Sequence, residues 1–375
     1  MKHINRHLLT IFFCLISYLS FSQINNQAFI RPGDSLDSIS GKFYLNLNSN
    51  AYFKNNEYFG EIVEGYTLFG YNMVLSAGYG FNENFTVEAG AFARWDFGKQ
   101  DYNKLLPYFR IDYHKNKDQL LFGNINGWLA HNYFEPMYEF ENFMTNTPEL
   151  GIQYLRRGKW YDLDVWVDWQ NMIYPGDSTK EEIAGGLVFD NRIINNNSIT
   201  IGVPFQFKVY HRGGQIDVSQ ASLITRTNIA IGPKINFKLS DESVVKNLEG
   251  SFYWLNFNDG SGTQLLPFSK GTGIMANALI HFKNKSQLLL SYWDSSDYYS
   301  YQGGRLYQSM STEYGNGAYQ ENRQLLFLRY TYDLTVADDS YLTFRAEPFY
   351  DFQNSSLDYS FAVYFNVNLT YPISK

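Results

Sequence analysis

Apolar and polar residues alternate with a period of two along much of this chain. Between positions 161 and 169 the odd-numbered residues are Tyr, Leu, Val, Val and Trp, whereas the even-numbered ones are Asp, Asp, Trp and Asp. Successive side chains of a β-strand point to opposite faces, so this segment predicts a strand with one apolar face and one largely polar face. The same alternation recurs over residues 85–97 and 357–371.

Segments of this kind, separated by turn-forming residues, predict about 16 strands, with about 14 or about 18 left open by the less distinct turns. The predicted strands cover residues 41–54, 65–81, 84–97, 104–114, 117–128, 149–157, 159–170, 182–191, 197–210, 222–239, 247–257, 272–283, 285–296, 321–333, 340–350 and 356–371.

The connections between these strands alternate between short and long. Short turns fall at 82–83, at 115–116 and around residues 158 and 284. The longer connections cover residues 55–64, 129–148, 171–181, 211–221, 258–271 and 297–320. Such alternation is typical of a membrane barrel whose two chain ends lie on the same side of the bilayer. We therefore predict an all-β fold, a transmembrane antiparallel up-and-down β-barrel over residues 41–371.

The composition supports a barrel over a helical membrane protein. Aromatic residues make up 18% of the chain, with 31 Tyr and 31 Phe, yet the mean hydropathy is −0.33. Beyond the N-terminal region no segment approaches the roughly 18 continuous apolar residues that a spanning helix needs. Aromatic girdles and alternating strands give a barrel this composition. A secreted soluble β-sandwich also alternates and remains an alternative. The net charge of −7 argues against binding to nucleic acid.

Residues 1–22 predict a cleavable signal peptide, because a basic start precedes an apolar run over residues 8–21 that is shorter than the roughly 20 residues of a spanning helix. The mature chain would then begin near Gln23, with a periplasmic segment over residues 23–40. A short membrane anchor is the alternative. The single cysteine, Cys14, lies in the apolar run, so the mature chain has no thiol for a disulfide, a zinc site or a nucleophile. We expect neither a cofactor nor a metal.

Taken together, the signal peptide, the even number of amphipathic strands, the alternating connections and the aromatic-rich last strand resemble the general outer-membrane porin family over about residues 41–371. The resemblance is architectural and rests on no sequence motif. It implies a Gram-negative outer membrane as the location. The implied partners are outer-membrane lipid, lipopolysaccharide, the barrel-insertion machinery and small polar solutes. A homo-oligomer stays open, because a lipid-facing surface and an oligomer interface look alike in one sequence.

Residues 129–148 form the third outer loop of the predicted barrel and are rich in Tyr, Phe and Met. A loop surrounded by water seldom carries so many apolar side chains unless they pack against something. In general porins this loop folds into the lumen and narrows the pore. The resemblance therefore implies a constriction lined by His131, Glu135, Glu139 and Glu141. The alternative is a loop that packs against neighbouring loops at the rim.

Asp162, Asp164 and Asp168 share one face of the predicted strand 159–170, opposite its apolar face. If the apolar face meets lipid, these acids point into the lumen, where fixed carboxylates favour cations. Arg94 and Arg110 are further candidates for the lumen wall. In the alternative, the acids are neutralised across the barrel by arginines, namely Arg94, Arg110, Arg226 or Arg329.

The predicted function is passive diffusion of small polar solutes, because about 16 strands leave an aqueous lumen whereas eight would be filled by side chains. If loop 129–148 blocks the lumen, the second hypothesis is a surface-recognition or structural barrel that displays its Tyr-rich outer loops, notably 297–320.

An outer-membrane hydrolase is the third hypothesis, and it would need a histidine beside a nucleophile or a water. The mature chain has histidines at positions 114, 131, 211 and 281, and neither a G-x-S-x-G nor a His-Glu-x-x-His motif. His211, at the start of an outer loop, is the best placed of the four. We expect no enzyme activity.

Overall fold

Sixteen antiparallel strands close into one barrel, which confirms the predicted fold class. The computed structural model describes residues 26–30, 39–240, 242–311 and 317–373. The predicted signal peptide, residues 1–22, and much of the segment 23–40 lie outside these ranges. Each of the 16 predicted strands has a counterpart in the barrel wall, with ends that differ by a few residues.

Three wall strands are recorded as two segments each, namely β8 with β9, β10 with β11 and β12 with β13, so the strand labels run to 19. The strands are β1 (Phe43–Phe59), β2 (Glu64–Asn82), β3 (Phe85–Asp96), β4 (Lys104–Lys115), β5 (Asp118–Asn124), β6 (Leu150–Arg157), β7 (Tyr161–Asn171), β8 (Glu181–Asn191), β9 (Ile194–Asn195), β10 (Ile199–Gly202), β11 (Phe205–Gly213), β12 (Ile224–Ile231), β13 (Lys234–Lys238), β14 (Val245–Asp259), β15 (Lys270–Phe282), β16 (Ser286–Ser296), β17 (Asn322–Ala337), β18 (Ser340–Asp351) and β19 (Ser356–Pro372). Short helical turns are η1 (Gln27–Phe29), η2 (Trp128–His131), α3 (Asn142–Thr145) and η3 (Arg305–Tyr307). None of the described helices is long and apolar enough to cross a membrane.

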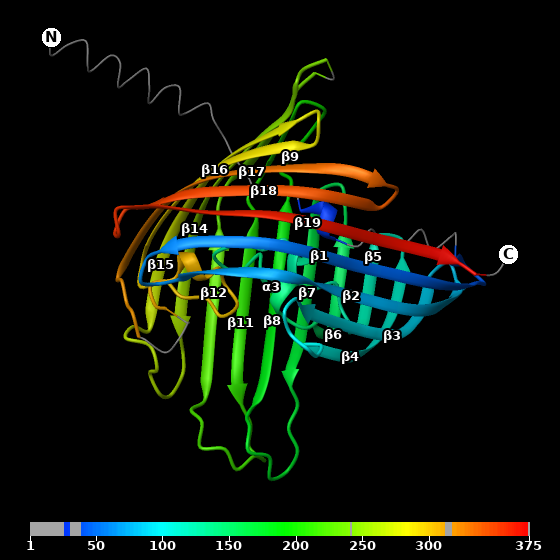
Figure 1. Ribbon diagram of the computed structural model, residues 1–375, viewed down its shortest axis with the longest axis horizontal. Helices are drawn as coiled ribbons and strands as arrows, with labels where there is room; N and C mark the ends of the chain where they lie inside the picture. The colour runs from blue at the N-terminus through cyan, green and yellow to red at the C-terminus, as the bar shows by residue number, and fades with distance from the viewer. Residues whose placement is uncertain (1–25, 31–38, 241, 312–316, 374–375) are drawn as a thin grey trace.

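The first strand closes the barrel by pairing with β2 on one side and with the last strand, β19, on the other. This seam runs from Tyr44 opposite Pro372 to Glu57 opposite Tyr359. In Figure 1 the red β19 lies beside the blue β1, although the two are the ends of the chain. Closure gives every wall strand two neighbours, so the backbone groups find partners without water.

The predicted strands 197–210 and 222–239 are each interrupted by a proline, which corrects their prediction as continuous strands. Pro204 separates β10 from β11, and Pro233 separates β12 from β13. Proline has no backbone N–H to donate to the ladder. At the first break the side chain of Asn191 replaces the missing ladder bonds, since its amide donates to the Val203 carbonyl at 2.9 Å and its oxygen accepts from the Val203 N–H at 2.7 Å. The wall stays continuous, because β10 pairs with β13 and β11 pairs with β12.

The outer surface of the wall is apolar and the inner surface is largely polar. On β7, Val165, Val167 and Trp169 are exposed on the outside, whereas Asp164 and Asp168 are buried on the inside. Large exposed apolar residues recur on strands around the wall, including Leu105, Ile152, Leu290 and Phe361. A soluble sandwich would bury such a face against a second sheet. An apolar exterior on a closed barrel is instead suited to a lipid bilayer.

The hydrophobic core lies inside the lumen. Tyr133, Met137 and Tyr138 from the third outer loop pack there with inward side chains of the wall such as Trp166 and Phe327. The short strands β5 and β6 flank this loop, which carries η2 and α3. The interior is therefore filled by loops as well as by wall side chains, and it is there that the candidate site forms.

Leu290→Arg should reduce the free energy of unfolding by about 2–4 kcal/mol, because it places a charge at the middle of a lipid-facing strand. Leu290 lies midway along β16 and its side chain is 45% exposed. Leu357→Arg, near the end of β19, is the matched control, with an expected cost of about 0–1 kcal/mol. Guanidinium unfolding from lipid vesicles, followed by tryptophan fluorescence, measures both. Equal costs at the two positions would contradict this placement of the membrane.

Candidate functional site

The third outer loop, residues 129–148, crosses the interior of the barrel. The hydroxyl of Tyr133 donates to the Phe207 carbonyl on β11 at 2.8 Å, and Asn72 on β2 donates to the Phe143 carbonyl at 2.5 Å. Six strands, β3 to β8, lie between β2 and β11 in the wall. The loop therefore contacts nearly opposite sides of the lumen. This agrees with the expectation from the porin resemblance that the third outer loop folds into the lumen.

A second outer loop, between β16 and β17, folds inward and packs on the first. The Glu139 N–H donates to the Gln302 carbonyl at 2.8 Å, and the Gly304 N–H donates to the Glu135 carbonyl at 2.8 Å. The two loops together are called the plug below, residues 129–148 and 297–311. For residues 129–148 the sequence left open a position in the lumen or packing against neighbouring loops. In the structure this loop lies in the lumen and also packs against the loop between β16 and β17. The tyrosines of the second loop at 298, 299 and 307 are buried in the plug and not displayed at the surface.

Glu135 joins the plug to the barrel wall. Its carboxylate accepts from Arg329 on β17 at 2.6 Å, from Arg345 on β18 at 3.4 Å and from the Tyr307 hydroxyl at 2.8 Å. Burial alone would raise the pKa of Glu135, but the two guanidinium groups outweigh it and hold the pKa well below its usual range. Glu135 is therefore ionised and held by two cations of the wall.

Glu139 and Glu141 share the cation Arg305, which belongs to the second loop. Arg305 donates to Glu139 at 2.9 Å and to Glu141 at 2.8 Å, and Glu141 also pairs with Lys54 on β1. Burial raises the pKa of Glu139, and the neighbouring Glu141 adds to this rise although Arg305 opposes it. Burial opposes ionisation of Glu141 too, but Lys54 and Arg305 lower its pKa. The pair thus links both halves of the plug to the first strand.

His131 ends η2 and is clamped between two carboxylates. Its Nδ1 lies 2.8 Å from Asp164 Oδ2, its Nε2 lies 2.7 Å from Glu149 Oε2, and its ring stacks on Trp166 at 4.4 Å. Burial alone would lower the pKa of His131, but Asp164 and Glu149 raise it to about 10. The imidazole is therefore a cation at neutral pH that ties the plug to β7.

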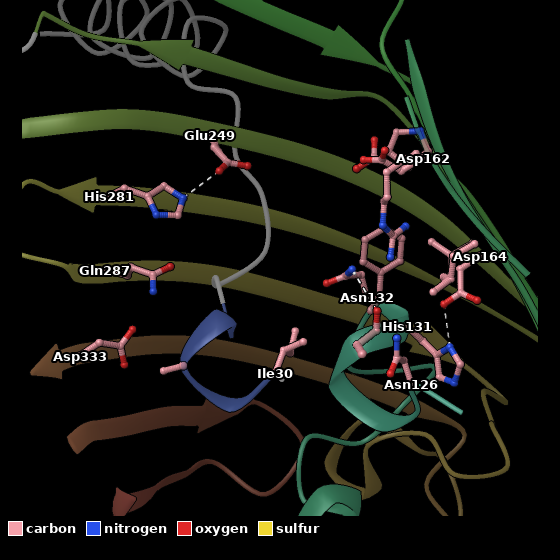
Figure 2. A pocket seen from close by; sticks show the side chains of 18 of the residues that line it. Ile30, Asn126, His131, Asn132, Asp162, Asp164, Glu249, His281, Gln287 and Asp333 are labelled. Atoms are coloured by element: carbon pink, nitrogen blue, oxygen red, sulfur yellow. Dashed lines mark hydrogen bonds and ion pairs between the residues drawn. The ribbon is translucent and has the colours of Figure 1, made fainter. Parts of the chain in front are cut away.

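A polar cavity of about 1010 Å³ lies between the plug and the end of the barrel where the short turns are. We call it the vestibule. Figure 2 shows Asp162 and Asp164 on the wall of the vestibule, and His131 and Asn132 at the end of the vestibule next to the plug. Charged groups of both signs line it nearer the mouth, including Arg110, Asp112, Lys234, Glu249, Lys283 and Asp333.

The predicted wall residues do not form one cluster. Asp162, Asp164 and Arg110 line the vestibule. Asp168 is buried and accepts from the Leu150 N–H at 2.8 Å. Arg94 lies beside the end of the first plug loop and pairs with a neighbour on its own strand, Asp96, at 3.0 Å.

The acids of β7 do not use the arginines named as their alternative partners. Asp162 pairs with Arg192, and Asp164 pairs with His131. Arg226 pairs instead with Asp259 at 3.0 Å. Asp162 and Asp164 are therefore neutralised by cations other than the four named arginines, and the ion pairs among the described residues include none with Asp168.

Several charged residues of this network were not predicted, among them Lys54, Glu149, Arg305, Arg345 and Glu347, which pairs with Arg329 at 2.9 Å. Lys54 and Arg345 do stand at inward positions of their strands, so a search for charges on the polar face would have found them. Arg305 lies outside the strands, where alternation carries no information, whereas Glu149 begins the predicted strand 149–157 on the same face as the inward Gln153. In the described part of the chain, no group of three or more His, Cys, Asp or Glu side chains is arranged to hold a metal ion.

A closed barrel of 16 strands with an apolar exterior and inward-folded loops defines a porin-like outer-membrane β-barrel. Solved structures agree. OprD from Pseudomonas aeruginosa is 11% identical over 91% of this chain and 97% of its own, with a TM-score of 0.51. A form of OmpT from Vibrio cholerae that lacks loop L8 is 12% identical over 88% of this chain and 100% of its own, with a TM-score of 0.52. At such identities the likeness is one of fold.

The sequence itself identifies the family. Residues 31–375 match the family described as lipid A 3'-O-deacylase-type, and the chain belongs to that family. No curated protein matches the chain significantly. The family name refers to deacylation of lipid A, whereas the solved structures show the fold alone.

His131→Gln should remove a pH-dependent part of the stability. A cationic His131 contributes fully below its ordinary pKa of 6.5, and this contribution is lost as pH rises through about 10. Between these values the stability advantage of the native protein over the variant should shrink, by at most about 1.4 kcal/mol per pH unit for one linked proton. Unfolding in detergent at several pH values measures the difference. A difference that stays constant across this range would contradict a cationic clamp.

Proposed function

We propose that this protein is a gated porin-like channel for small polar solutes, in which the plug controls the passage. The observation that carries the proposal is the vestibule, a polar cavity of about 1010 Å³ that leads along the lumen to His131. A barrel that served only as a surface scaffold would not need a wide, charged interior open to one side. The burial of Tyr298, Tyr299 and Tyr307 in the second loop also weighs against surface display, although Tyr319 near the end of that loop is exposed.

Gating follows from the contacts of the plug with the wall. The two cavities beside the plug measure about 60 and 30 Å³, room for a few water molecules but not for a hydrated solute. Solutes would therefore pass only when some plug contacts open. The ion pairs of Glu135 with Arg329 and Arg345 are suited to this role, because they join the first plug loop to β17 and β18, two strands far from it in sequence.

Replacing residues 129–148 by a short Gly-Ser linker should give a larger and steadier single-channel conductance than the native protein in a planar bilayer. Glu135→Gln should raise the fraction of time spent open, because the neutral amide binds the two guanidinium groups more weakly. Glu64→Gln, at an exposed position at the start of β2, is the matched control and should behave like the native protein. A heat-modifiable, inserted barrel with no current in any of these forms would refute the channel.

Lipid A deacylation is the second candidate, and the family assignment favours it. Removing an acyl chain from a lipid needs a base and a nucleophile on the lipid-facing side near the outer end of the barrel. His211 fits this position, since it lies near the loop end of β11 and its Nδ1 is 2.9 Å from the Thr225 hydroxyl. The ion pairs among the described residues include none with His211, so a carboxylate that would orient the imidazole is lacking there. We rank this activity below the channel for that reason.

Mass spectrometry of lipid A distinguishes the two candidates. Under the channel proposal, cells that express the native barrel should keep the lipid A mass of cells without it. A loss equal to one acyl chain, abolished by His211→Ala and retained in Glu135→Gln, would instead establish the deacylase.

A further inference from the structure

The N-terminal residues 26–30 lie inside the barrel although they precede the first strand. They form the turn η1, and its Phe29 is surrounded by three aromatic rings. The centroid of the Phe29 ring lies 5.4 Å from Phe140, 5.3 Å from Phe143 and 5.0 Å from Tyr364. Two of these contacts, with Phe140 and Tyr364, are edge-to-face, the geometry that aromatic pairs prefer.

The three rings come from two different parts of the molecule. Phe140 and Phe143 belong to the plug, whereas Tyr364 is an inward residue of β19. Phe29 therefore fills a gap between plug and wall. We call Phe140, Phe143 and Tyr364 the aromatic site, and residues 26–30 the arm.

The rest of the arm is placed between the vestibule and the plug. Ala28 is buried, Ile30 lines the vestibule, and Asn26 lines the cavity of about 60 Å³ beside the plug. Figure 2 shows η1, which carries Ile30, in the same pocket as the turn that carries His131. The arm thus occupies part of the path that a solute would take.

The arm could leave this position without breaking the wall. The backbone bond of its turn is internal, from the Phe29 N–H to the Asn26 carbonyl at 2.9 Å. Ladder pairing of the first strand begins only at Phe43. Release would therefore uncover the aromatic site and leave the barrel pairing intact.

We propose that the aromatic site is a docking site for an aromatic side chain of a short peptide, and that the arm is its built-in occupant, which fastens the plug to β19. The ligand class follows from the geometry: three rings converge on one aromatic side chain, and the residues on either side of that side chain, Ala28 and Ile30, line the vestibule. The docking does not depend on conduction. Any effect of the arm on the ionic current through the barrel rests on the proposed channel function.

Thiol labelling tests the docking directly, because the only native cysteine, Cys14, lies in the predicted signal peptide. Ala28→Cys should react with a maleimide at least about tenfold more slowly than Asn132→Cys, whose side chain is exposed in the same vestibule. Adding Phe29→Ala should bring the rate at position 28 up to that at position 132. Adding Phe268→Ala, which removes a lumenal ring that packs on Phe257 away from the arm, should leave it slow. Equal rates at positions 28 and 132 in the otherwise native chain would overturn the proposal.

Peptide binding tests the ligand class with a second readout. A fluorescent peptide of sequence Asn-Gln-Ala-Phe-Ile should bind the refolded Phe29→Ala barrel in detergent and should bind the native barrel much more weakly, because the native arm competes. The same peptide with Ala in place of Phe should not bind. Failure of the first peptide to bind, or equal binding of both, would overturn the docking site. Slow labelling and peptide binding in a barrel that carries no current would refute the channel alone and leave the docking site standing.

Discussion

The balance of charge inside the lumen is the constraint on which the rest of the structure depends. The alternation of the strands places cations such as Lys54, Arg329 and Arg345 on the inner face of the wall, where all three side chains are buried. A buried charge without a partner costs several kcal/mol. Glu141 of the plug neutralises Lys54, and Glu135 of the plug shares Arg329 and Arg345 with Glu347 of β18, so the wall depends on the plug for part of its charge balance.

The same arrangement explains the mixed chemistry of the plug. Its rim is ionic, where Glu135 and Glu141 meet the wall, and its interior is aromatic, where Tyr133 stacks on Tyr138 with ring centroids 5.9 Å apart. Ion pairs fix the position of the loops, because they are directional, whereas aromatic packing excludes water and strengthens the pairs nearby. Under the proposed gating, such a plug would open by small displacements at its rim without unfolding.

An alternation of apolar and polar residues with a period of two determines which parts of this fold and site can be predicted from the sequence. It tells which face of a strand each residue occupies, so the 16 strands and the outward positions of Val165 and Val167 follow from the pattern alone. It does not tell which residue lies opposite. The pairing of His131 with Asp164 and the packing of Gln302 on Glu139 join segments far apart in the chain, and no local pattern marks them. The strand breaks at Pro204 and Pro233 do follow from the sequence, because proline cannot donate a backbone hydrogen bond to the ladder.

The plug has a consequence for how the barrel is assembled. The seam joins the first strand to the last, so it can form only after the whole chain is present, and contacts so distant in sequence form slowly. The third outer loop reaches both sides of this seam from within, through Glu141 to Lys54 on β1 and through Phe140 to Tyr364 on β19. It therefore works as an internal clasp. Once these contacts have formed, β1 and β19 cannot separate unless the contacts of the loop break first. The finished barrel therefore unfolds slowly as well as folding slowly.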